Sequence, residues 1–170
     1  MVPFFFTSLI SYQNGGEHHR WIAFGIFTAA SITDALDGLL ARVMHIRTRL
    51  GRFLDPLADK LLLLSGFLGL LFVDHFPYEP PLWVTVTIVF RDLILIAGLI
   101  MIYFMTQTLR IAPNLLGKCV TASQMLTLIT ILLKWRISLI FCYITAALTI
   151  LSGLAYIVRE LKLLNAKSEV

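Results

Sequence analysis

The sequence predicts an all-α protein, a polytopic membrane bundle of six helical segments that form one domain over residues 1–170. Two features of the composition support this fold class. Of the 170 residues, 58% are hydrophobic and 14% are charged, whereas a soluble domain has about 25% charged residues. The apolar residues also gather into runs with short polar breaks, and five of these runs approach the roughly 20 residues that a helix needs to cross a bilayer.

The runs follow one another along the whole chain. The first, residues 2–11, is too short to span a membrane. The second begins at Trp21 and continues with helical spacing to Met44, and the others cover residues 53–73, 82–105, 116–133 and 137–158. Pro56 disfavours helical geometry at Asp55, so we expect the third helix to start or bend there.

The charges between the runs predict the orientation of the bundle. Basic residues concentrate after the second and fourth runs and in the C-terminal tail, whereas the break at residues 74–81 has two acidic residues and no Lys or Arg. The positive-inside rule therefore predicts that both termini lie on the cytosolic side. The net charge of +4 suits anionic lipid headgroups. The sequence has no basic and aromatic array of the kind that binds nucleic acid.

Four aspartates lie close together at the predicted cytosolic ends of the second and third helices. The first stripe, with the helical spacing i, i+3, i+4 and i+7, consists of Asp34, Asp37, Gly38 and Ala41. The second stripe, with the spacing i, i+4 and i+8, consists of Gly51, Asp55 and Asp59. Each spacing places its residues on one face of a helix. Two antiparallel helices with a short connection therefore bring four carboxylates together.

Four carboxylates in a small volume require cations to neutralise them. Oxygen ligands without nearby His or Cys suit Mg²⁺ or Mn²⁺, and two such ions can serve displacement at phosphorus. The small residues of both stripes leave room for a ligand against the backbone, and Arg42 suits a phosphate. Alternatively, the acids are a solvated helix end. However, Asp34 and Asp37 directly follow an apolar run, where acidic residues usually have a function.

These positions resemble the signature of the CDP-alcohol phosphatidyltransferases, D-x2-D-G-x2-A-R-x8-G-x3-D-x3-D. Every spacing is met, by Asp34, Asp37, Gly38, Ala41, Arg42, Gly51, Asp55 and Asp59. The stretches FRDLILIAG and GKCVTASQM are similar to the phosphatidylglycerolphosphate synthase and cardiolipin synthase branches. The resemblance implies a six-helix membrane fold, usually a homodimer, and a metal-dependent transfer of a phosphatidyl group from CDP-diacylglycerol with release of CMP.

The resemblance also implies a role for each motif residue. Two divalent cations, Mg²⁺ or Mn²⁺, are expected to be ligated by Asp34, Asp37, Asp55 and Asp59. Asp59 is further expected to be the general base that takes the proton of the acceptor hydroxyl. The CDP site is expected to be lined by Gly38, Ala41, Arg42 and Gly51. No covalent enzyme intermediate is needed, which agrees with a sequence in which no Ser/His or Cys/His pair stands out.

The start of the chain departs from the family pattern. Members of these branches usually begin with a longer first helix after an Asn-Pro-Asn-like stretch. Residues 1–10 read MVPFFFTSLI and look like the second half of that helix, so we expect the first segment to be truncated. The resemblance implies an integral protein of the bacterial or mitochondrial inner membrane, with the active site facing the cytosol or matrix.

The motif leaves the acceptor alcohol open. Three basic residues outside it are candidates for binding an acceptor phosphate: Arg91, Arg110 and Lys118. They favour glycerol-3-phosphate, the acceptor of phosphatidylglycerolphosphate synthase. The alternative acceptor is phosphatidylglycerol, as in cardiolipin synthase, and the pair Arg91-Asp92 looks more like that branch. An ion pair with an aspartate is another role open to Arg91. A divalent-cation transporter is a remote alternative that explains the acids but not the fixed glycine and arginine spacing.

Overall fold

The structure is a computed structural model that describes residues 2–43, 51–73, 76, 78–106 and 115–168. Within these residues it contains helices and no strand, which confirms the all-α prediction. The helices are α1 (Val2–Gly15), α2 (Glu17–Val43), α3 (Gly51–Leu71), α4 (Leu82–Thr106), α5 (Leu115–Leu132) and α6 (Ser138–Ser168). Each predicted apolar run corresponds to one of them.

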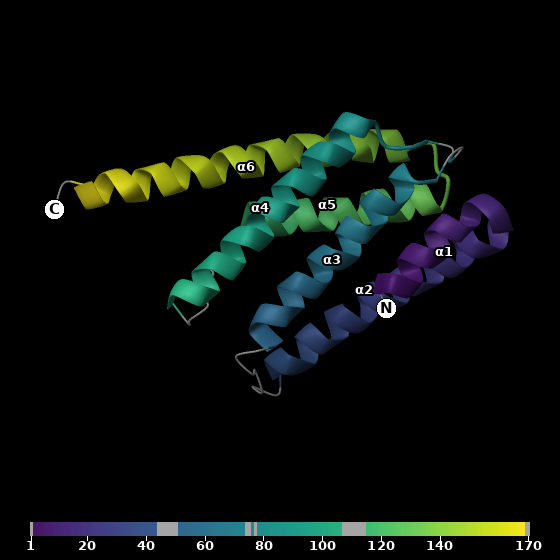
Figure 1. Ribbon diagram of the computed structural model, residues 1–170, viewed down its shortest axis with the longest axis horizontal. Coiled ribbons are helices and arrows are strands. Elements are labelled where there is room, and N and C mark those ends of the chain that lie inside the picture. The colour runs from purple at the N-terminus through teal and green to yellow at the C-terminus, as the bar shows by residue number, and fades with distance from the viewer. Residues whose placement is uncertain (1, 44–50, 74–75, 77, 107–114, 169–170) are drawn as a thin grey trace.

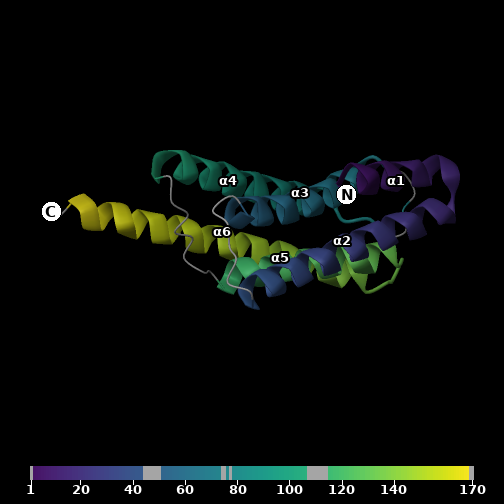
Figure 2. The same cartoon turned by 90° about the horizontal axis from the view of Figure 1, so that it is seen from below.

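Consecutive helices run in opposite directions along the long axis of the bundle (Figure 1). The ends of α2, α4 and α6 and the starts of α3 and α5 therefore lie toward one end, which we call the motif end. The α1–α2 turn, the start of α4 and the α5–α6 turn lie at the opposite end, which we call the far end. Figure 2 shows the same bundle from below, with α6 extending beyond the other helices at the motif end.

The helix α3 holds the bundle together, since it contacts α1, α2, α4 and α5. Its buried Leu63 and Phe67 pack in one apolar core with Phe5 and Leu9 of α1 and Phe27 of α2. Glycines of α3 let side chains of α1 and α5 approach its backbone closely, as is common between membrane helices. The core therefore fixes the half of α3 that lies toward the far end.

The described outer surface of α4 and α6 carries many apolar side chains. Large side chains that are 56–67% exposed include Leu82, Phe90, Ile94 and Met101 of α4 and Ile140, Leu151 and Leu154 of α6. Such a surface is expected of helices that face lipid. Among the described residues, Leu115–Leu132 and Ser138–Tyr156 are long and apolar enough to cross a membrane. These two spans are found among the described residues alone, so the five spans expected from the sequence stay a prediction.

Tryptophan residues lie at the far end. Trp21 is near the start of α2, Trp83 is near the start of α4, and Trp135 is in the α5–α6 turn. Trp is enriched at membrane–water interfaces, so the far end has the composition of an interface.

Two helix boundaries differ from the sequence-based expectation. The helix α3 begins at Gly51, before Pro56, so a start near Asp55 is wrong, whereas a bend there stays a prediction. The helix α6 continues to Ser168, ten residues past the apolar run at 137–158. Most of the residues in this extension, RELKLLNAKS, are good helix formers, but their mixed polarity ended the apolar pattern.

Candidate active site

The backbone places the eight motif positions in helices at the motif end. Five of them fall in the last ten residues of α2: Asp34, Asp37, Gly38, Ala41 and Arg42. The other three fall in the first nine residues of α3: Gly51, Asp55 and Asp59. The two helices are in contact with each other. The helical backbone places positions 34 and 37 on one face of α2, and positions 55 and 59 on one face of α3.

Of the four aspartates, Asp59 is the one whose side chain the structure describes, and it is half-buried on α3. The side chains of the other seven motif residues lie outside the described part. Arg110 falls in residues 107–114, which also lie outside it. The expected roles of these residues therefore stay predictions.

The chemistry of the four aspartates fits a divalent cation. All four expected ligands are carboxylates, which hard cations such as Mg²⁺ and Mn²⁺ prefer. Among the side chains that the structure describes, no group of three or more His, Cys, Asp or Glu could hold a metal. Three of the four expected ligands are outside that set, so the fit depends on the helical positions and on the type of donor.

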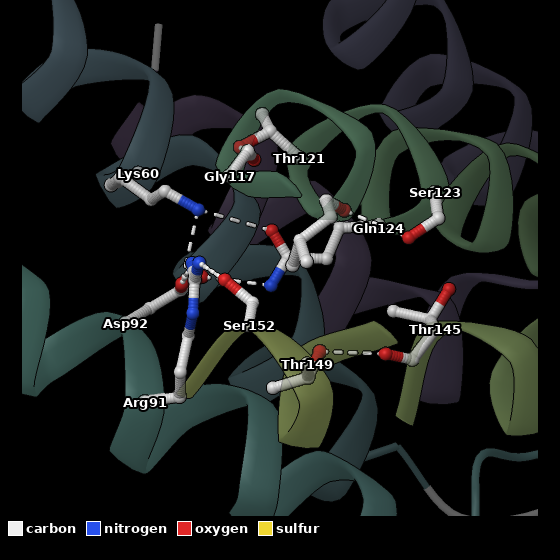
Figure 3. A network of polar contacts seen from close by, with 11 residues as sticks. Lys60, Arg91, Asp92, Gly117, Thr121, Ser123, Gln124, Thr145, Thr149 and Ser152 are labelled. Carbon is white, nitrogen blue, oxygen red and sulfur yellow. Dashed lines mark hydrogen bonds and ion pairs between the residues drawn. The ribbon is translucent and has the colours of Figure 1, made fainter. Parts of the chain in front are cut away.

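Next to Asp59, a buried polar network joins α3 to its neighbours (Figure 3). The ammonium of Lys60 donates to Asp92 Oδ1 of α4 at 3.0 Å and to Gln124 Oε1 of α5 at 3.2 Å. The amide nitrogen of Gln124 donates to Asp92 Oδ2 at 2.9 Å. Lys60 therefore has one partner on each of two neighbouring helices, and these partners are bonded to each other.

Arg91 extends this network to α6. Its Nη1 donates to Asp92 Oδ1 at 2.8 Å, and its Nη2 donates to Ser152 Oγ of α6 at 2.8 Å. Asp92 is 1% exposed and Arg91 is 8% exposed. We call Lys60, Arg91, Asp92, Gln124 and Ser152 the Asp92 network.

The candidate acceptor residues thus differ in their surroundings. Arg91 is buried in an ion pair with Asp92, which is the alternative role that the sequence left open to it. Lys118 is exposed on the first turn of α5, toward the motif end. Sequence reasoning did not single out Lys60 and Gln124. The available signal was their position as polar residues inside apolar runs, since buried polar groups are almost always paired.

Comparison with known proteins decides the family. The profile of the CDP-alcohol phosphatidyltransferases matches residues 1–151. The chain belongs to this family. The match confirms the resemblance inferred from the motif. Members of the family are membrane enzymes and are generally dependent on divalent metal ions.

Individual relatives carry names from two branches. A Mycobacterium tuberculosis protein named probable phosphatidylglycerophosphate synthase is 45% identical over 96 residues, which are 55% of this chain and 43% of the relative. A Haemophilus influenzae protein named CDP-diacylglycerol–glycerol-3-phosphate 3-phosphatidyltransferase is 33% identical over 165 residues, covering 92% of this chain and 85% of the relative. A human protein named cardiolipin synthase (CMP-forming) is 34% identical over 121 residues, covering 62% and 39%. The chain thus spans less than half of the Mycobacterium and human relatives.

Proposed function

We propose that the protein transfers a phosphatidyl group from CDP-diacylglycerol to glycerol-3-phosphate and releases CMP, as a phosphatidylglycerolphosphate synthase. The observation that carries the proposal is the complete family motif, divided between the end of α2 and the start of α3 at the motif end. Relatives named CDP-diacylglycerol–glycerol-3-phosphate 3-phosphatidyltransferase, from Haemophilus influenzae and Bacillus subtilis, are 33% and 36% identical and support the choice of acceptor.

The four aspartates would hold the metal ions. Asp34 and Asp37 of α2 and Asp55 and Asp59 of α3 are proposed to ligate two Mg²⁺ or Mn²⁺ ions. When bound, the ions would supply positive charge to the pyrophosphate of CDP-diacylglycerol. The site needs this charge because carboxylates at the edge of a bilayer repel an anionic substrate.

Asp59 is proposed to act as the general base as well. Its carboxylate accepts the proton of the acceptor hydroxyl, and the hydroxyl oxygen forms a bond to the lipid-side phosphorus. The bond between this phosphorus and the CMP oxygen breaks, and CMP leaves with the electron pair. The half-buried position of Asp59 on α3 supports this role, since the side chain is not enclosed by the apolar core.

The remaining motif residues are proposed to bind the nucleotide. Gly38, Ala41 and Gly51 leave room for CDP against the helices, and Arg42 binds a phosphate. Among the acceptor candidates we place Lys118 first, because it is exposed near the motif end, whereas Arg91 already pairs with Asp92.

The motif end is proposed to face the cytosol of a bacterium or the mitochondrial matrix, with the bundle in the inner membrane. The helix ends that border the basic breaks after α2 and α4 lie at this end, as expected from the positive-inside rule. Lys134 and Arg136, in the α5–α6 turn at the far end, are an exception to it. We also propose that the protein forms a homodimer, as is usual in the family.

A second candidate is cardiolipin synthase, which uses phosphatidylglycerol as the acceptor. The human relative with this name favours it. An exposed Lys118 is also compatible with it, because phosphatidylglycerol carries a phosphate too. Family membership favours either transferase over a cation transporter.

The test is an assay of the purified protein with labelled CDP-diacylglycerol and Mg²⁺ or Mn²⁺. Glycerol-3-phosphate and phosphatidylglycerol are offered separately, and the lipid product is identified. We expect CMP release and phosphatidylglycerolphosphate with the first acceptor. Cardiolipin formed from the second acceptor alone would support the second candidate, and no CMP with either acceptor would contradict both.

A further inference from the structure

Lys60 lies between the candidate catalytic residues and the apolar core of α3. It directly follows Asp59 and is the tenth residue of the helix. Successive residues of an α-helix are turned by about 100°, so a fixed direction for Lys60 also fixes the directions of positions 55 and 59. Asp92 and Gln124 hold the Lys60 ammonium from α4 and α5, which restricts rotation of α3 at its motif end.

The charges of the network reinforce this restriction. Lys60 and Arg91 donate to the same oxygen of Asp92, so two cations share one carboxylate. Asp92 and Gln124 are 1% and 0% exposed, and Lys60 also interacts electrostatically with Asp59. Without the charge of Asp92, Lys60 and Arg91 would lose the carboxylate that they share. Leaving cations in or near the protein interior without a counter-charge is strongly unfavourable.

We propose that Asp92 and Gln124 are positioning residues for the phosphatidyl transfer. By holding Lys60, they keep α3 in the rotation at which Asp55 and Asp59 meet the aspartates of α2. They act through Lys60 and the helix, without contact with the substrate. The reaction and the metal site both rest on the proposed function, whereas the measurement of Mn²⁺ affinity does not require the reaction to take place.

The network allows a test in which a carboxylate and an amide change places. The variant Asp92→Asn removes the shared counter-charge. The double variant Asp92→Asn/Gln124→Glu returns a carboxylate to Lys60 from α5 and restores the total charge of the network. The affinity for Mn²⁺ alone is measured by electron paramagnetic resonance on the purified protein, and kcat and both KM values are measured from CMP release.

We expect Asp92→Asn to raise the Kd for Mn²⁺ at least about fivefold and to lower kcat at least about tenfold, because α3 loses its rotational restraint and cations remain unpaired. Both KM values should stay within about twofold, since neither residue is proposed to contact a substrate. The double variant should recover most of the Mn²⁺ affinity and of kcat.

Thr145→Val is the matched control for a loss of buried polar contacts. It removes the hydrogen bond of 2.8 Å between Thr127 of α5 and Thr145 of α6 and leaves every contact of Lys60 in place. Its Tm should fall while the Kd for Mn²⁺ and kcat stay unchanged. If Asp92→Asn does not fold, Gln124→Leu takes its place. It keeps the ion pairs of Asp92 and should show a smaller change in the same direction.

Unchanged Mn²⁺ affinity in the folded variant would overturn the proposal. So would a double variant that recovers Tm without recovering Mn²⁺ affinity, because the network would then only stabilise the fold. If the unmodified protein releases no CMP with either acceptor, the proposed function fails. The comparison of Mn²⁺ affinities then still decides the positioning role.

Discussion

Lys134, which follows α5, is ion-paired with Glu17 at the start of α2, across 117 positions of sequence. Lys134 has a left-handed backbone with φ of 56°. The turn around it is closed by hydrogen bonds from Lys134 N to Ile131 O at 2.8 Å and from Trp135 N to Thr130 O at 3.0 Å. This is the pattern of a Schellman helix end. The turn brings Lys134 to Glu17, so the ion pair fastens α5 to α2 at the far end.

The ion pair predicts a dependence of stability on pH. Hydrogen bonds from Lys134 and then from Arg20 hold the pKa of Glu17 below its ordinary value. The pair therefore stabilises the fold above the ordinary pKa of Glu, and this contribution is lost as the pH falls through the lowered pKa. We expect Glu17→Gln to lower Tm at neutral pH by a small amount, because Glu17 is exposed. The difference should vanish in acid when Tm is measured along a pH series.

High salt provides the control for this prediction. Salt screens exposed charges, so the Tm difference between the unmodified protein and Glu17→Gln should also shrink at neutral pH in concentrated salt. A difference that persists at low pH and at high salt would assign the effect to packing of the side chain.

Two glycines of α3 are predicted to be sensitive to a single methyl group. A Cβ at Gly66 would lie 2.7 Å from Leu128 Cδ1, and a Cβ at Gly69 would lie 2.6 Å from Leu9 Cδ2. Both leucines are fully buried, so they have little room to move. Gly66→Ala and Gly69→Ala should each lower stability by about 1–2 kcal/mol, as overpacked cores do, measured by thermal unfolding in detergent.

Gly25→Ala is the matched control for these substitutions. Gly25 lies in α2, and a Cβ there would meet nothing within 4 Å. This variant should leave Tm unchanged or raise it, because alanine favours a helix more than glycine does. Equal effects at all three positions would contradict close packing around α3.

Removal of the metal or of any one ligand should abolish turnover. Asp34→Asn, Asp37→Asn, Asp55→Asn and Asp59→Asn should each reduce CMP release by orders of magnitude, since each removes a charge that holds the ions. Excess EDTA should stop the reaction, and Mg²⁺ or Mn²⁺ should restore it. The control Glu79→Gln, in the α3–α4 connection at the far end, should keep full activity. Substantial turnover in EDTA would exclude the two-metal site.

The acceptor site predicts a selective kinetic effect. Lys118→Gln should raise the KM for glycerol-3-phosphate far more than the KM for CDP-diacylglycerol, because the phosphate of the acceptor would lose the ammonium group that binds it. Arg136→Gln is the matched control, since Arg136 is exposed at the far end and should affect neither KM. Equal losses for both substrates would assign Lys118 a structural role and remove a main support for glycerol-3-phosphate.

The helices and the motif could be predicted because both depend on local sequence. Apolar runs marked every helix to within a few residues except for the end of α6, and the motif spans residues 34–59 with fixed spacing. The Asp92 network is different, since Lys60 is 32 positions from Asp92 and 64 from Gln124. Sequence spacing does not show which distant polar residues meet. It shows only that each needs a partner when buried.

The length of α6 has a practical consequence for imaging this protein. Its 31 residues make a rod of about 46 Å at 1.5 Å per residue, whereas the hydrocarbon core of a bilayer is about 30 Å thick. The rod continues past the rest of the bundle at the motif end (Figure 1). A protein of 19.2 kDa embedded in a micelle offers few features for aligning particle images. A fiducial domain joined to α6 through an unbroken helix would give such images a rigid marker outside the micelle.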